Sequence, residues 1–299
     1  MTQPSTASAV PFRRFRTLRR PASAGMKTPD TQKPKVLDVA FIANCREGWC
    51  FALPSWRQAY STPSNLARCA PPEAFLALRA SLAAFWLGIT IWSMAEHKSN
   101  DWETAPEWYI YLTHWTLLFE LFYLILATVV SGLAIASRNR EPDGTTPCYV
   151  RLTYALQVLT YVAPFFVFVL FWALVYDWSS PDPPSVLSCF THGVNFVVAL
   201  CDFLIAGLPM RLNQMWVPVL YGITYVLFSL IYDLAGGTAG GEPYIYAVLN
   251  WSENAGVAAA YGGGVVFGAF PIVFLACLFC VYPLRNLCQC CPAAKGLDV

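Results

Sequence analysis

Charged residues are scarce in this sequence. Asp, Glu, Lys and Arg make up 12% of its 299 residues, about half of the roughly 25% that is usual in soluble globular domains. Hydrophobic residues account for 57% and aromatic residues for 15%. So few charges cannot cover the surface of a water-soluble protein of this size, and so apolar a chain is not intrinsically disordered. The composition is typical of an integral membrane protein.

Motifs for common cofactors are also lacking. The sequence contains no Gly-rich phosphate loop ending in GK[ST], no HExxH zinc motif and no CxxCH haem motif. Its first arginines lie in an N-terminal tail that does not resemble a folded nucleic-acid-binding module. We therefore expect no cofactor, no metal ion and no nucleic-acid partner.

Six stretches are long and apolar enough to cross a bilayer. A spanning helix needs about 20 mostly apolar residues, since the hydrocarbon layer is roughly 30 Å thick and a helix rises about 1.5 Å per residue. The stretches are Ala74–Ala95, Trp108–Ile135, Leu152–Tyr176, Val186–Leu208, Trp216–Leu234 and Gly263–Leu284. The sequence therefore predicts an all-α fold, a polytopic membrane bundle of six transmembrane helices.

Charge divides the chain into a basic tail and a membrane domain. The first 73 residues carry 11 Lys and Arg against 4 Asp and Glu, whereas the remainder carries 8 against 14. We assign residues 1–72 to a mostly disordered tail, 73–285 to the six-helix domain and 286–299 to a short tail. Arginine-rich and acidic loops alternate along the domain. Because Lys and Arg are in excess on the cytoplasmic side of membrane proteins, both termini are predicted to be cytoplasmic.

The basic tail indicates a contact with the membrane surface. Residues 1–35 lack the apolar stretch of a secretory signal peptide, and we expect them to lie near anionic lipid headgroups. An organellar transit peptide is the alternative, although Pro11 and Pro21 interrupt any amphipathic helix. Residues 41–69 are predicted to form a short interfacial segment.

Two kinds of covalent modification are candidates. Cys288, Cys290 and Cys291 directly follow the sixth span, a position suited to palmitoylation, with unmodified interfacial thiols as the alternative. Asn250 begins an Asn-Trp-Ser glycosylation signal on the predicted outer side. Because Asn250 lies close to the membrane, the glycosylated and the unmodified side chain are both alternatives.

Polar and ionisable side chains recur on one face of three spans. Such groups are costly in hydrocarbon and usually face the bundle interior, where they form a functional site or specify helix packing. They are Thr113, Thr116, Glu120 and Tyr123 in the second span, His192, Asn195 and Asp202 in the fourth, and Tyr225 in the fifth. Thr113 and His192 lie about six residues below the outer ends of their spans, roughly 9 Å, so we expect them at one level. Arg79, near the cytoplasmic end of the first span, is expected to extend to the headgroups.

Several of these segments resemble the rolling stone family of multi-span membrane proteins. The matching pieces are YLTHW at 111–115, HGVNFVVALCDFLI at 192–205, PVLYGITYVLFSLIYDLAGGT at 218–238 and YIYAVLNW at 244–251. The family is associated with myoblast fusion. The resemblance implies a non-enzymatic protein of the plasma membrane, with the endoplasmic reticulum as the alternative, that acts in cell–cell fusion or adhesion.

A wider similarity links this family to the androgen-induced-protein group of membrane hydrolases, which cleave branched fatty acid esters with a threonine and a histidine inside the membrane. Their Leu-Thr pair is matched here at 112–113, but their His-Gly-x-His pattern reads HGVN at 192–195, so Asn195 replaces the second histidine. An amide cannot accept the proton of a hydroxyl nucleophile. The similarity implies a lipid esterase with Thr113 as nucleophile if His192, one helical turn away, acts as the base.

The same polar faces also allow functions without catalysis. Asn195, Glu120, Asp202 and Tyr225 are candidates to hold a bound lipid by hydrogen bonds. Glu120 and Asp202 alternatively mark a proton or cation path, although no inverted repeat or broken helix pair is evident.

Overall fold

The computed structural model describes residues 51–53, 55–64, 70–100, 105–139 and 145–285, with the side chains of residues 98–100 and 105 excepted. Within these residues the chain is helical, and the sole β-type pairing is an isolated bridge between Ala239 and Glu242. Six helical segments are long and apolar enough to cross a membrane, as predicted. The tail up to residue 50 and Cys288, Cys290 and Cys291 lie outside the described residues.

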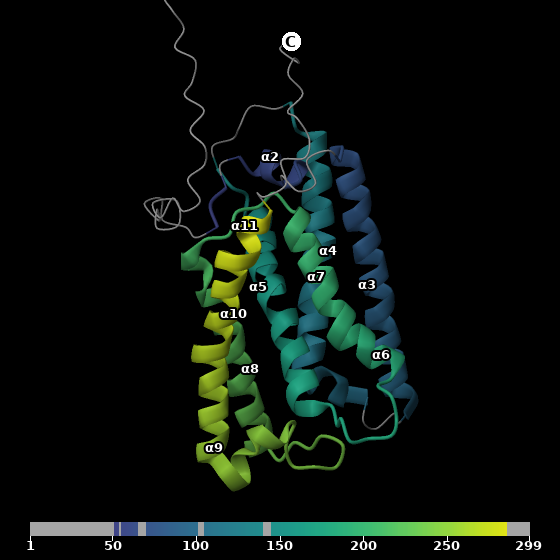
Figure 1. Ribbon diagram of the computed structural model, residues 1–299, viewed down its shortest axis with the longest axis vertical. Coiled ribbons are helices and arrows are strands. Elements are labelled where there is room, and N and C mark those ends of the chain that lie inside the picture. Colours follow the sequence, from purple (N-terminus) through teal and green to yellow (C-terminus); the bar gives the residue numbers. More distant parts are fainter. Residues whose placement is uncertain (1–50, 54, 65–69, 101–104, 140–144, 286–299) are drawn as a thin grey trace, which may run out of the picture. The chain divides into compact units, whose positions relative to one another are not determined.

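The six spans follow the order of the predicted stretches (Figure 1). They comprise α3 (Pro72–Asn100); α4 (Leu112–Ala136); α5 (Cys148–Leu170) with η3 (Phe171–Val175); α6 (Val186–Ser188), η4 (Cys189–Val194) and α7 (Asn195–Ile205); η5 (Leu212–Gln214) and α8 (Trp216–Leu234); and α9 (Trp251–Gly264), η7 (Val265–Ala269), α10 (Phe270–Ala276), η8 (Cys277–Val281) and α11 (Tyr282–Leu284). A short helix, α2 (Trp56–Ser61), precedes the spans, and the turns η2 (Ala105–Ile110) and η6 (Ala247–Leu249) precede α4 and α9.

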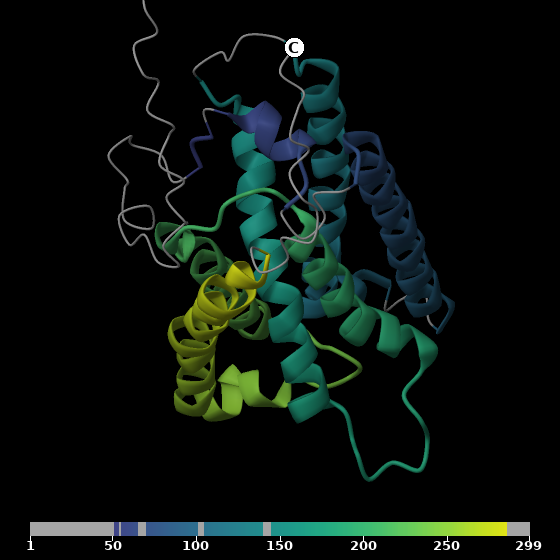
Figure 2. The same cartoon turned by 45° about the horizontal axis from the view of Figure 1, so that its top comes forward.

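Helix α5 forms the centre of the bundle. It packs against α4, α7, α8 and α10, whereas α3 packs against α4 on the side away from α5 (Figure 2). Thirteen of the 23 residues of α5 are buried, which is consistent with neighbours on several sides. Polar groups on α4, α7 and α8 are therefore gathered around one helix.

Four π-helical turns interrupt the third, fourth and sixth spans. They are η3, η4, η7 and η8. A π-turn adds a residue to one helical turn and so rotates the side chains that come after it, and such turns are frequent at functional sites. Here η3, η4 and η7 all contribute residues to the wall of one cavity.

The sixth span begins twelve residues earlier than predicted, at Trp251 instead of Gly263. The Asn250 side chain accepts a hydrogen bond from the Glu253 backbone N–H at 3.0 Å and so caps the helix. The Asp233 carboxylate accepts one from the Trp251 N–H at 3.1 Å. Hydropathy did not indicate the first turn of α9, because its polar residues take part in capping the helix. A kink at Asn254 follows directly after that turn.

Charge separates the two ends of the bundle. One end, here the basic end, carries Arg57, Arg138, Arg151, Arg211 and Arg285. The other, the acidic end, carries Glu107, Asp177, Asp182, Asp233, Glu242 and Glu253. Helix α2 packs against α4 at the basic end, where the Arg57 Nε donates to the Ser137 hydroxyl at 3.1 Å. The positive-inside rule predicts that the basic end faces the cytoplasm.

Candidate functional site

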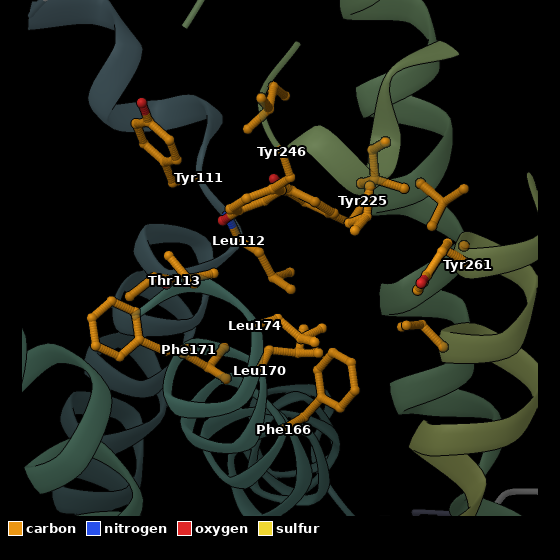
Figure 3. A pocket seen from close by; sticks show the side chains of 18 of the residues that line it. Tyr111, Leu112, Thr113, Phe166, Leu170, Phe171, Leu174, Tyr225, Tyr246 and Tyr261 are labelled. Atoms are coloured by element: carbon orange, nitrogen blue, oxygen red, sulfur yellow. The ribbon is translucent and has the colours of Figure 1, made fainter. Parts of the chain in front are cut away.

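A cavity of about 570 Å³ opens near the acidic end of the bundle. It lies between the start of α4, the end of α5 with η3, η4, α8, the segment 245–249 and the junction of α9 with η7. Most of its wall is apolar, and Figure 3 shows Thr113 beside Phe171 on one side and Tyr261 on the other. Its volume lies within the range of small-molecule sites. An apolar cavity of this size within a membrane protein fits a lipid chain.

Two tyrosines organise one side of the cavity. The Tyr225 hydroxyl donates to the Ile110 carbonyl at 2.9 Å, and the Tyr246 hydroxyl accepts from the Leu112 N–H at 3.3 Å. The Tyr246 hydroxyl also interacts with the Thr113 side chain, and burial raises the pKa of Tyr246 to about 12. Tyr246 is therefore a neutral phenol at physiological pH, and with Tyr225 it fixes the start of α4.

Both predicted catalytic residues line this cavity. Thr113 comes from the first turn of α4 and His192 from the π-turn η4. The His192 ring stacks on Phe171, with ring centroids 3.5 Å apart and planes within 3°. Its Nδ1 has no hydrogen-bond partner among the described residues. An unpaired ring nitrogen can accept or donate a proton, which is the property that a base or a ligand-binding group requires.

His114, which follows Thr113 directly, is a further polar residue of the wall. Its ring stacks on Trp108, with centroids 4.2 Å apart, and its Nδ1 lies at the Trp108 carbonyl oxygen. Unlike His192, it is therefore fixed by a backbone group. Its position next to Thr113 and its histidine ring were visible in the sequence, but its orientation toward the cavity depends on the turn at Tyr111 that begins α4.

Asn195 and Glu120 do not line the cavity. The Asn195 amide donates to the Thr191 carbonyl at 3.1 Å, and its Oδ1 has no partner among the described residues. Glu120 is 1% exposed, and neither of its carboxyl oxygens has a hydrogen-bond partner there. Tyr225, in contrast, lies on the wall. The polar residues of α4 and α7 are thus divided between the cavity and the helix interfaces.

Arg79 does not extend to the headgroups, contrary to the prediction. Its side chain is 1% exposed and its Nε donates to Asp202 Oδ1 at 3.1 Å. Its two terminal nitrogens donate to the hydroxyls of Ser131 at 2.9 Å and Tyr123 at 3.2 Å. Burial of a cation is costly unless it is paired and hydrogen-bonded, and here it is both. The ion pair joins α3 to α7.

Tyrosines complete the network around Asp202. The hydroxyls of Tyr123 and Tyr161 donate to Asp202 Oδ2, that of Tyr161 at 3.2 Å. The Gln157 amide donates in turn to the Tyr161 hydroxyl. The polar network of Arg79, Tyr123, Ser131, Gln157, Tyr161 and Asp202 therefore connects α3, α4, α5 and α7. Both oxygens of Asp202 are occupied, so this residue belongs to helix packing and not to the cavity.

The positions of Arg79 and Asp202 along their spans could have predicted the ion pair. Arg79 lies two turns inside the start of α3, and Asp202 one turn before the end of α7. Both ends are at the basic end of the bundle, so opposite charges at similar depth indicate a buried pair. However, an arginine side chain near the end of a span is also long enough to reach the headgroups, so the sequence was equally compatible with that position.

One family of known proteins matches most of the chain. The family described as Protein rolling stone matches residues 73–293. Protein rolling stone of Drosophila melanogaster is 27% identical over 189 residues, which cover 60% of this chain and 67% of the fly protein. No solved structure matches. With its six membrane-spanning helices, the chain belongs to the rolling stone family of multi-span membrane proteins.

Proposed function

We propose that this protein binds a membrane lipid in the cavity of Thr113 and His192, and acts with that lipid in cell–cell fusion or adhesion at the plasma membrane. The observation that carries the proposal is the composition of the wall, an apolar surface with polar groups from Thr113, His114, His192, Tyr225 and Tyr246. A lipid tail fits the apolar part, and an ester or carboxyl group can be hydrogen-bonded by the polar part. Membership of the rolling stone family supports the role in fusion.

Lipid binding can be tested by filling the cavity. Val265 lies on the wall, and Val265→Trp places an indole in the space of the ligand. Val129, on the exposed surface of α4 and outside the cavity, offers a matched control in Val129→Trp. We expect a photoactivatable fatty acid ester in membranes to label the wild-type chain and Val129→Trp equally, and Val265→Trp several-fold less. Equal labelling of all three chains would show that the cavity does not hold the probe.

The role in fusion is tested with the same variants. In cultured cells that fuse through this protein, content mixing should depend on the wild-type chain and on Val129→Trp, and should fall with Val265→Trp at equal surface expression. If Val265→Trp supports fusion as well as the wild type while losing the lipid label, then fusion does not require the bound lipid.

An intramembrane esterase is a second candidate, because Thr113 and the unpaired ring of His192 line one cavity. In this reaction the Thr113 oxygen attacks the ester carbonyl while His192 accepts its proton, the alcohol leaves with a proton from His192, and water releases the acid. Asn195 has no part in it, since it lies outside the cavity. A fluorophosphonate should then label the protein covalently, and Thr113→Ala should abolish that label while retaining the photoactivated lipid label. Absence of covalent labelling in the wild type counts against catalysis and leaves lipid binding intact.

A further inference from the structure

A second pocket, of about 310 Å³, lies at the basic end of the bundle. Its wall comes from α2, from the segment directly after it and from the ends of the fourth and sixth spans. Its polar lining residues are Ser55, Gln58, Thr62, Ser64, Tyr282 and Arg285. Besides hydroxyl groups, an amide and a guanidinium line this pocket, and neither kind of group lines the cavity of Thr113. The two cavities share no lining residue, so this pocket is a site separate from the cavity of Thr113.

Close backbone packing builds this pocket. The Ser64 N–H donates to the Ile205 carbonyl at 2.7 Å, and the Ser64 hydroxyl donates to the Leu204 carbonyl at 2.6 Å. A Cβ on Gly207 would lie 2.3 Å from the Thr62 carbonyl oxygen, so only glycine allows the two segments to approach this closely. The residues after α2 are therefore fixed against the end of α7.

Arg285 is the charged group of the pocket. Its side chain is 3% exposed, and one terminal nitrogen donates to the Leu208 carbonyl at 2.7 Å. The guanidinium carbon lies 5.7 Å from the centre of the Phe203 ring and 5.1 Å from that of Tyr282. No carboxylate in the described part of the chain forms an ion pair with it. A buried cation with neutral neighbours favours binding of an anion, which would compensate its charge.

The surroundings strengthen that preference. Arg211, which directly precedes η5, adds a second positive charge at this end of the bundle. Arg57 and Arg151 add positive charge at the same end. The pocket also lies where α7 and α11 end, the level at which lipid headgroups meet a membrane protein. Anionic lipids are concentrated in the cytoplasmic leaflet, and the basic end is the one predicted to face the cytoplasm.

We propose that this pocket binds a phosphate group, with the Arg285 guanidinium as the cationic partner and Gln58 and the hydroxyls of Ser55 and Thr62 as neutral donors. Guanidinium groups match phosphate oxygens in geometry and form charge-assisted hydrogen bonds with them. Two sources can supply the phosphate, the headgroup of an anionic phospholipid or a soluble phosphate from the cytoplasm. The same chemistry binds either of them.

Gln58→Glu tests the site without removing Arg285. Gln58 is exposed and lines the pocket, so the isosteric change places a carboxylate beside the guanidinium with little effect on packing. Arg138→Gln is the matched control, because it lowers the net charge of the same end by one unit at an exposed residue outside the pocket. Arg285→Gln is a second test, although it also removes the bond to Leu208.

The measurement is thermal unfolding of the full chain in detergent, followed by the fluorescence of its 11 tryptophans. Phosphatidylserine, phosphatidylcholine with the same acyl chains, and inorganic phosphate are added separately. We expect phosphatidylserine to stabilise the wild type and Arg138→Gln at similar concentrations, with about tenfold weaker apparent affinity in Gln58→Glu, the factor for one charge-assisted hydrogen bond.

Each other outcome has a defined meaning. Equal stabilisation by inorganic phosphate alone supports the phosphate site and assigns it to a soluble ligand instead of a lipid. Equal responses of Gln58→Glu and the wild type overturn the proposal. Stabilisation by phosphatidylcholine to the same degree as by phosphatidylserine overturns the assignment to an anionic lipid, because both headgroups carry a phosphate.

Discussion

Replacing Arg79 by glutamine removes the cation from the buried pair and leaves the Asp202 carboxylate with two tyrosine donors. Both side chains of the pair are 1% exposed, so neither solvent nor a lipid headgroup can replace the missing charge. Removal of one partner from a buried ion pair destabilises a protein by about 3–5 kcal/mol, because the remaining charge is uncompensated. We expect Arg79→Gln to lower the free energy of unfolding by that amount. Asp202→Asn should lower it by a similar amount, because it leaves the Arg79 guanidinium uncompensated.

The double variant Arg79→Gln/Asp202→Asn combines the two single changes and tests whether the two residues act as a pair. It removes both charges at once and leaves no uncompensated ion, so its effect should be smaller than either single change. Arg138→Gln is the exposed control. Arg138 pairs with Glu73 at 3.6 Å, but the two side chains are 58% and 63% exposed, and such surface pairs contribute about 0–1 kcal/mol.

Reversible unfolding in mixed detergent micelles, followed by tryptophan fluorescence, measures the wild type and all four variants under the same conditions. Two results would refute the reasoning. Arg79→Gln could prove no more destabilising than Arg138→Gln, which would mean that the buried pair is not formed. Alternatively, the double variant could lose as much stability as the two single variants together, which would mean that the two residues act independently.

Three further changes test other parts of the bundle. Thr116→Val removes the 2.9 Å hydrogen bond to the Tyr221 hydroxyl that joins α4 to α8, and should lower stability in the same unfolding assay by about 1 kcal/mol. Gly222→Ala places a Cβ 2.8 Å from the Phe270 ring, and overpacking of that kind should lower stability by about 1–3 kcal/mol. Asn250 is 7% exposed and its amide nitrogen donates to Glu253, so we expect no glycan there and no mobility change on deglycosylation. A mobility change would show that the cap forms only after modification or not at all.

Sequence alone predicted the six spans because length and hydropathy are properties of each segment by itself. It misplaced the start of the sixth span, since Asn250 and Asp233 cap a helix whose first turn is polar. It also predicted that Thr113 and His192 lie at one level, and both line the same cavity. That inference needed only the rise per residue and the two helix ends.

Rotations of the helices could not be predicted in the same way. The π-turn η4 has α-helical backbone angles at both of its ends, and η3 has them where it begins, at Leu170. No residue type marks either turn. The turn η4 nevertheless decides where His192 points relative to Asn195, because an added residue in a turn rotates the side chains after it. A face drawn with a uniform 100° step places these two residues together, whereas the cavity receives His192 alone.

The polar residues of the spans fall into two levels that differ in how fully their hydrogen bonds are satisfied. Both carboxylate oxygens of Asp202 are occupied, so a proton or cation path through Asp202 would first have to break its pair with Arg79. That requirement costs about 3–5 kcal/mol and disfavours the path.

At the level of the cavity, the His192 ring lacks a partner among the described residues and faces space that a lipid can fill. Unsatisfied polar groups beside a cavity indicate ligand binding more strongly than ionisable groups that already satisfy one another. Arg79→Gln should therefore reduce stability, whereas Val265→Trp should reduce lipid labelling.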